Sequence, residues 1–298
     1  MTVERFEKLF KSTSLENKVT FPHDLLGSFD ISAESLDEIR ELVIKILVLG
    51  TDLFPGKNNC KKVDFSRLLE VLRKTKVIKL EKHPDLFTLL EKLLVREISK
   101  SVNVKKFKGI EFPVNLRIVH PEPPTGYLVK KNPTDFFHCD PWAGEPEDIV
   151  NVLLHVYSLP QSSSINFLDT VDTNHEAIKA YKGSYLSGQP LIKKLPALNL
   201  SSNNGRVLIF DPFLPHATRR GLDDIRISID FRMRINDPYS TLDRNWFHRK
   251  IPWSKYWLLP QTGFCRYHEK YLEEIKALTK SGKTKAVHLR KERYEVEK

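Results

Sequence analysis

Apolar side chains recur every three or four positions in the first third of the chain, the spacing of amphipathic helices. Ser35 and Glu38 form a candidate capping box at the start of the first such stretch, which ends at Gly50. Residues 1–30 lack this pattern, and their Pro and Gly residues predict an irregular lead-in. We expect three helices, over residues 35–50, 64–74 and 84–98.

From Phe112 onward the pattern changes to short β-like runs separated by Pro, Asn and Gly. Many short strands without long helices between them indicate an antiparallel sandwich or jelly roll. The stretch 169–204 is mostly polar, and we interpret it as a loop that covers the mouth of a barrel and holds part of a substrate site, or as a plain surface excursion. The expected strands are 114–119, 127–131, 136–140, 149–157, 165–168, 206–210 and 225–233.

Beyond Arg234 the chain is rich in aromatic and basic residues. Such a segment can line a pocket or stack on bases, but it more often packs onto the core. A helix is expected over 266–280. No Gly/Ser-rich or Pro-rich linker divides the chain, so we predict one domain, with a helical brace (1–110), a jelly-roll core (111–235) and a C-terminal aromatic segment and helix (236–298).

The composition is that of a folded protein, with 298 residues of which 40% are hydrophobic. The net charge of +10 can attract nucleic acid, or it can steer a small acid to a basic rim. Three scattered cysteines argue against a disulfide framework, and the N-terminus lacks an apolar leader. The longest apolar run, residues 42–49, is too short to span a bilayer. We therefore expect a cytoplasmic protein with no membrane partner.

A candidate metal site lies in the sequence Phe136-Phe137-His138-Cys139-Asp140. On an extended chain His138 and Asp140 project to one side and can share a cation, while Cys139 points away. His216 would supply a third ligand from a distant strand. Two imidazoles and one carboxylate leave positions open on an octahedral ion, as in non-haem Fe(II) oxygenases. Zinc accepts the same donors, so the ligand set alone leaves the metal open.

A candidate anion site follows ten residues after His216. Arg226 and Ser228 stand two apart in an alternating run, so their side chains face the same way. A planar guanidinium beside a hydroxyl suits a carboxylate, which it binds with paired charge-assisted hydrogen bonds. That carboxylate need not belong to the protein.

The order His-x-Asp, a long insert, His, and then Arg-x-Ser resembles the Fe(II)- and 2-oxoglutarate-dependent dioxygenases, most of all their phytanoyl-CoA dioxygenase branch. The resemblance covers residues 113–235. It implies a mainly β fold with bracing helices (α+β), namely a double-stranded β-helix (a cupin-like jelly roll) with N-terminal and C-terminal helices. It also implies Fe(II), 2-oxoglutarate and O2 as cofactor and cosubstrates.

The resemblance assigns His138, Asp140 and His216 as catalytic iron ligands, and Arg226 with Ser228 and Thr218 to 2-oxoglutarate. The implied reaction hydroxylates an unactivated carbon of a small metabolite, with release of succinate and CO2. That metabolite would be drawn by the basic rim if it is anionic. The residues placed to touch the substrate are Asn151, His155 and Trp142, for which ordinary packing is the competing role.

Two alternatives stay open. The run Arg226-x-Ser228-x-Asp230-x-Arg232 is similar to the Arg-x-Asn-x-Thr-x-Arg signature of alkylation-repair demethylases, although two residues differ and the histidine spacing fits poorly. A nucleic-acid or protein demethylase or hydroxylase of the same superfamily is therefore less favoured. The other alternative is a jelly-roll binding protein without turnover.

Overall fold

The computed structural model describes the chain in segments, which together include both candidate sites. The C-terminal aromatic segment and its expected helix fall outside the described residues, as do the expected strand 127–131 and most of the expected helix 64–74. The described segments are 6–11, 18–50, 68–70, 72, 84–110, 114–121, 133–143, 149–158, 164–170, 175–200, 203–221 and 225–235.

Seven antiparallel strands form the larger sheet, in the order β1-β2-β8-β5-β10-β3, with β4 also paired to β10. The smaller sheet has the order β7-β6-β9 and is also antiparallel. The strands of the larger sheet are β1 (Thr20–His23), β2 (Leu26–Asp30), β3 (Phe107–Ile110), β4 (Asn115–Val119), β5 (Ile149–Tyr157), β8 (Arg206–Phe210) and β10 (Arg226–Ile235); those of the smaller are β6 (Ser164–Leu168), β7 (Ala197–Leu198) and β9 (His216–Arg219).

The connections between the two sheets make the fold a jelly roll. From β4 onward the chain crosses to the small sheet at His138, which bridges His216 of β9, and then returns to the large sheet as β5. It crosses again to β6 and β7, returns as β8, crosses to β9 and ends in the large sheet as β10. This alternation gives the order β4-β10-β5-β8 in one layer and His138-β9-β6-β7 in the other, the double-stranded β-helix predicted from the sequence.

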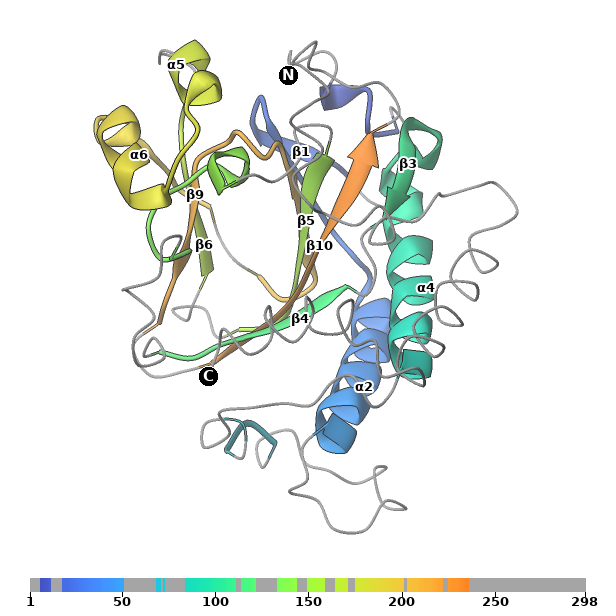
Figure 1. The fold of residues 1–298 in the computed structure, drawn as a ribbon. Helices are drawn as coiled ribbons and strands as arrows, with labels where there is room; N and C mark the ends of the chain where they lie inside the picture. The colour runs from blue at the N-terminus through green and yellow to red at the C-terminus, as the bar shows by residue number, and fades with distance from the viewer. Residues whose placement is uncertain are drawn as a thin grey trace, which may run out of the picture.

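Two helices brace the outer face of the larger sheet. Helix α2 (Ala33–Gly50) and helix α4 (Pro84–Ser101) lie side by side and contact each other (Figure 1). Their apolar faces share one buried cluster with every second residue of β5 and β10. The members from the two strands are Val150, Val152, Leu154, Val156, Ile227, Ile229, Phe231, Met233 and Ile235.

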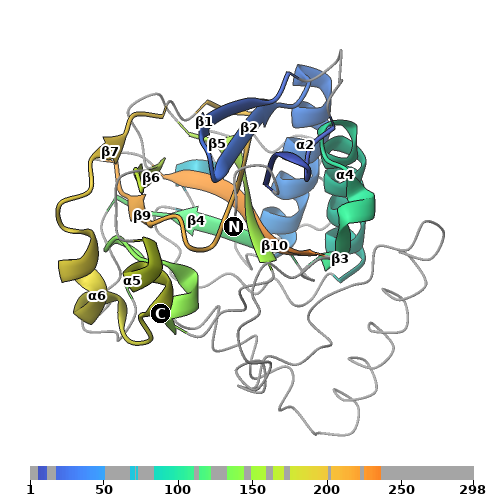
Figure 2. The same cartoon turned by 90° about the horizontal axis from the view of Figure 1, so that it is seen from above.

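The remaining short helices lie on the other side of the molecule. Seen from above, helices α5 (His175–Ala180) and α6 (Tyr185–Ile192) lie across from α2 and α4 (Figure 2). They pack with the 3-10 helix η5 (Asp140–Ala143), while a second one, η3 (Val104–Lys106), precedes β3. The polar stretch 169–204 therefore contains two short helices, followed by strand β7.

The capping of α2 differs from the prediction. The backbone N–H of Ser35 donates to Oγ of Ser32 at 3.2 Å, so Ser32 caps the helix one turn before the predicted capping box. The helix itself and α4 are confirmed. Among the described helices, none has the length and apolarity to cross a bilayer.

The expected irregular lead-in is wrong, because it contains β1 and β2. Strand β2 pairs with β8 along its whole length, and β1 is the outer strand of the sheet. Pro22 lies in β1, a position that an edge strand tolerates because one of its sides has no ladder partner. The prediction failed because β2 joins the sheet through long-range pairing with β8, which the local sequence does not reveal, and β1 adds to it as a hairpin.

We expect Ile39→Ala in α2 to lower the free energy of unfolding by about 2–5 kcal/mol, because the Ile39 side chain is fully buried between helix and sheet. The matched variant Glu41→Ala removes an exposed side chain of the same helix and should change it by less than about 0.5 kcal/mol. Urea unfolding measures both values. Equal effects of the two substitutions would show that α2 does not brace the sheet.

Candidate metal centre and anion pocket

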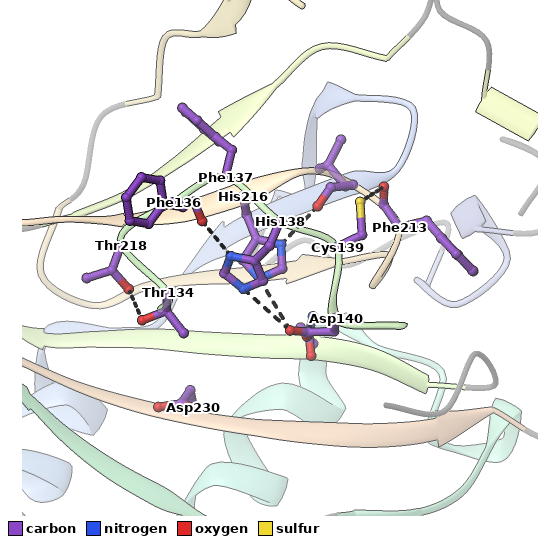
Figure 3. A network of polar contacts seen from close by, with 12 residues as sticks. Thr134, Phe136, Phe137, His138, Cys139, Asp140, Phe213, His216, Thr218 and Asp230 are labelled. Atoms are coloured by element: carbon purple, nitrogen blue, oxygen red, sulfur yellow. Dashed lines mark hydrogen bonds and ion pairs between the residues drawn. The ribbon is translucent and has the colours of Figure 1, made fainter. Parts of the chain in front are cut away.

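Three side chains far apart in the sequence converge between the two sheets (Figure 3). One ligand atom from each of His138, Asp140 and His216 lies within 4.8 Å of the others, and all three residues are buried. Asp140 Oδ1 lies 3.6 Å from Nε2 of His138 and 3.8 Å from Nε2 of His216. The three atoms thus surround one point, as the ligands of a single cation do.

Backbone pairing brings the two histidines together. The N–H of His138 donates to the carbonyl of His216, and the reverse hydrogen bond closes the pair, both at 3.0 Å. The expected strand 136–140 is reduced to this single bridge, because η5 begins at Asp140. The predicted alternation is nevertheless present, since Cys139 is buried in the cluster beneath α5 and α6.

Both imidazoles are oriented by hydrogen bonds at their other nitrogen. Nδ1 of His138 lies 2.8 Å from the carbonyl of Phe136, and Nδ1 of His216 lies 2.9 Å from that of Leu214. A carbonyl only accepts, so each Nδ1 carries the proton and each Nε2 keeps its lone pair for a metal. Burial lowers the pKa of His216 to about 4, which keeps its ring neutral.

The two carboxylate oxygens of Asp140 face different neighbours. Its Oδ1 faces the imidazoles, whereas its Oδ2 accepts a hydrogen bond from Asn151 at 2.7 Å and lies 3.9 Å from Nη2 of Arg232. Burial alone would raise the pKa of Asp140, but contacts with His138, His216 and Arg232 hold it well below its usual range. The group is therefore ionised and presents one oxygen to the metal position.

The donor set fits a divalent cation. Two neutral imidazole nitrogens and one charged oxygen, all oriented by outer hydrogen bonds, suit Fe(II) or zinc and leave positions free for other ligands. Asn151, which the sequence placed at a candidate substrate contact, donates a hydrogen bond to the candidate metal ligand Asp140.

A second group of buried polar side chains lies on the inner face of β10 and β5. The Arg226 side chain is 2% exposed, and its Nε and Nη1 have no hydrogen-bond partner among the described residues. Burial, with the nearby charge of Arg117, lowers the pKa of Arg226 to about 9, so it remains a cation at neutral pH. An unpaired buried cation is costly, which points to an anionic ligand at this place.

The neighbouring arginines differ from Arg226 because each has an acid. Arg117 holds both oxygens of Asp230 at 2.9 and 3.0 Å, and Arg220 holds Asp135 at 3.1 Å. Both acids are thus paired with other arginines and act on Arg226 through their charge alone, and within the described part of the chain no protein acid hydrogen-bonds to its Nε or Nη1. Because the other two arginines are each paired with an acid, the charges grouped around Arg226 sum to a net positive value.

Two further buried groups beside Arg226 lack partners within the described residues. Ser228 lies two positions along β10, so it shares the inner face, and its Oγ makes no hydrogen bond. His155 of β5 lies directly opposite Ser228, is fully buried, and has neither ring nitrogen bonded. Burial and the charges of Arg226 and Arg206 lower the pKa of His155 to about 3.

The other predicted contacts are placed differently. Thr218 follows His216 on β9 and donates to Oγ1 of Thr134 at 3.3 Å, as Figure 3 shows. Trp142 packs under α5 and α6, where its indole N–H donates to the carbonyl of Ile178. Thr218 therefore lies near the candidate metal ligand His216 and has a protein partner, and Trp142 is part of a packing cluster.

Sequence reasoning missed Tyr185. Its ring stacks on the imidazole of His138 with a centroid distance of 3.9 Å and an interplanar angle of 21°. The same helix approaches η5 so closely that a Cβ added at Gly188 would lie 2.2 Å from the Trp142 ring. Gln189 also donates to the carbonyl of Phe137. No sequence signal pointed to Tyr185 beyond its position in the polar stretch 169–204.

Comparisons with known proteins give low similarity throughout. No protein-family model matches the chain, and no curated protein matches it. Solved structures to which it is similar include EctD from S. alaskensis with 2-oxoglutarate and 5-hydroxyectoine (12% identity, 82% of this chain and 81% of that chain, TM-score 0.43). Another is the non-heme alpha-ketoglutarate-dependent carbocyclase SnoK from nogalamycin biosynthesis, at 11% identity over 80% of this chain and 87% of that chain, with a TM-score of 0.43.

A third is an N-substituted L-amino acid dioxygenase from Burkholderia ambifaria AMMD (12% identity, 72% of this chain and 86% of that chain, TM-score 0.36). Because these identities and TM-scores are low, the likeness carries no weight for the function. We assign the function from the chain's own residues.

We expect Asn151→Ala to weaken binding of Fe(II) or Mn(II) by about 10- to 100-fold, because Asp140 loses the donor that orients it. Anaerobic calorimetric titration of the metal measures the change. Leu153→Met alters the same face of β5 without touching Asp140 and should bind metal as the wild type does. A wild-type affinity in the Asn151 variant would rule out an orienting role.

The depressed pKa of His155 gives a pH-dependent stability in the metal-free protein. Below pH 6.5 the unfolded chain takes up a proton at this histidine, whereas the folded protein does so only near pH 3. The free energy of unfolding should therefore fall as the pH drops from about 6 to 4, by up to ~1.4 kcal/mol per pH unit for this group. Urea unfolding at several pH values measures this dependence. In His155→Gln the free energy of unfolding should depend on pH less steeply than in the wild type, by that amount. The same dependence in both proteins would contradict a neutral buried imidazole.

Proposed function

We propose that the chain is an Fe(II)- and 2-oxoglutarate-dependent dioxygenase that hydroxylates an unactivated carbon of a small molecule. The observation that carries this proposal is the pairing of two sites inside one jelly roll. One is a buried set of two imidazoles and a carboxylate that fits a metal. The other is Arg226, buried on the neighbouring inner face, whose Nε and Nη1 have no hydrogen-bond partner among the residues that the structure describes; it fits the distal carboxylate of a diacid.

His138, Asp140 and His216 would hold the iron through Nε2, Oδ1 and Nε2. Arg226 would bind the distal carboxylate of 2-oxoglutarate, with Ser228 as a hydroxyl donor, and Thr218 stays a prediction for the same ligand. When bound, iron would supply, with 2-oxoglutarate and O2, oxidative decarboxylation to succinate and CO2, in which one oxygen atom of O2 enters succinate and the other enters a C–H bond of the substrate. The chain would orient the metal and the cosubstrate, neutralise the distal carboxylate through Arg226, and exclude water from the buried site.

The substrate side of the site is proposed to include the excursion 169–204. Helix α6 contacts the metal-binding segment through Tyr185 and Gln189, so a substrate near the metal would meet this helix. A buried site between two sheets suits a small molecule better than a duplex or a folded protein. A basic chain surface would favour an anionic substrate.

Purified protein supplied with Fe(II), ascorbate and 2-oxoglutarate should release succinate slowly even without its substrate. His138→Ala and Asp140→Ala should abolish this release with the fold retained, because each removes a metal ligand. Succinate is measured by mass spectrometry, and circular dichroism checks the fold. Wild-type protein that binds iron but releases no succinate would favour a jelly-roll binding protein instead.

We expect Arg226→Ala to raise the KM for 2-oxoglutarate about 10- to 100-fold, because a charge-assisted pair of hydrogen bonds is lost. Arg96→Ala removes an arginine that pairs with Glu38 and Glu97 on the helical side and should leave the KM unchanged. The rate of succinate release is recorded against 2-oxoglutarate concentration. An unchanged KM in the Arg226 variant would place the cosubstrate elsewhere.

A further inference from the structure

His155 has no explained role in the fold. It is fully buried, and both of its ring nitrogens lack hydrogen-bond partners within the described residues. Native proteins pair nearly all buried polar atoms, so two unpaired nitrogens on one ring indicate a missing ligand. Its backbone carbonyl, by contrast, accepts a hydrogen bond from the N–H of Gly205 at 2.8 Å.

The position of His155 shows which end of the site its ring faces. The polar residues of β5 at 151 and 155 share one face, and Asn151 contacts the metal ligand Asp140. Four residues of extended chain separate them by roughly 13 Å, so His155 lies well away from the metal. It stands instead opposite Ser228 and within the field of Arg226.

The unpaired atoms beside it form a set of donors. Arg226 offers N–H groups at Nε and Nη1, Ser228 offers its hydroxyl, and a neutral imidazole offers one N–H. A carboxylate has about four lone-pair positions on its two oxygens. Four donors on one face of two paired strands therefore match one carboxylate.

We propose that His155 binds the same carboxylate as Arg226 and, with Ser228, makes the pocket selective for a keto acid that carries a second carboxylate. This rests on the proposed function, because it assigns the residue to the cosubstrate of that reaction. His155 is then a cosubstrate ligand and does not contact the molecule to be oxidised.

The test compares two keto acids that differ at the distal end. Both 2-oxoglutarate and pyruvate can chelate a metal through their keto-acid end, but only 2-oxoglutarate has a second carboxylate. Binding of each to the Mn(II)-loaded protein is measured by calorimetry, without turnover. The variants are His155→Phe, which keeps a ring without polar atoms, His155→Gln, which keeps a donor, and the control Leu153→Met from the same face of β5.

We expect the wild type and Leu153→Met to bind 2-oxoglutarate much more tightly than pyruvate. His155→Phe should lose about 10- to 100-fold in affinity for 2-oxoglutarate with pyruvate unchanged, and His155→Gln should recover most of that loss. If His155 had only a structural role, His155→Phe would lose affinity for both acids by the same factor.

Three results would overturn the inference. If the wild type and His155→Phe both prefer 2-oxoglutarate over pyruvate to the same extent, the role of His155 is refuted and the proposed function still stands. If His155→Phe loses the same factor in affinity for both acids, His155 has a structural role only. Wild-type protein that binds Mn(II) but neither acid would refute the proposed function, and this inference with it.

Discussion

The alternation of side chains along β10 is the constraint on which the rest of the structure depends. Its isoleucines and Phe231 pack against the helices, so its polar residues must face the space between the sheets. There Arg226 Nε and Nη1 and the Ser228 hydroxyl have no hydrogen-bond partner among the described residues, while Asp230 pairs with Arg117 and Arg232 lies near Asp140. A register shift of one residue would bury the charges under α2 and expose the apolar face to the site.

Burial gives the two sites their chemical character. Removing water strengthens each remaining electrostatic contact, so Asp140 stays ionised among two histidines and an arginine, and His216 stays neutral. The same removal makes an unpaired guanidinium unfavourable in the absence of an anion. The unfavourable burial of Arg226 thus lies at the place where we propose that a charged ligand binds, while the acids nearby pair with the neighbouring arginines.

The three candidate metal ligands depend on contacts between segments that are distant in sequence. His138 and His216 hold each other through two backbone hydrogen bonds across the small sheet. Asp140 receives its orientation from Asn151 of the large sheet, and His138 is stacked by Tyr185 of the excursion. Both sheets and the short helices must therefore be assembled before the three ligand atoms meet.

The sequence by itself determined the alternating strands β5, β8 and β10, the helices α2 and α4, and the six residues proposed for metal and cosubstrate, because periodicity and motif spacing are local properties. Only the tertiary structure decided that β1 and β2 extend the large sheet, that residues 136–140 form a bridge, and that Tyr185 stacks on His138. It also separated Asn151 from His155, which share one strand face. The physical reason is that a side chain's partner across a sheet is set by register and packing, which no single segment encodes.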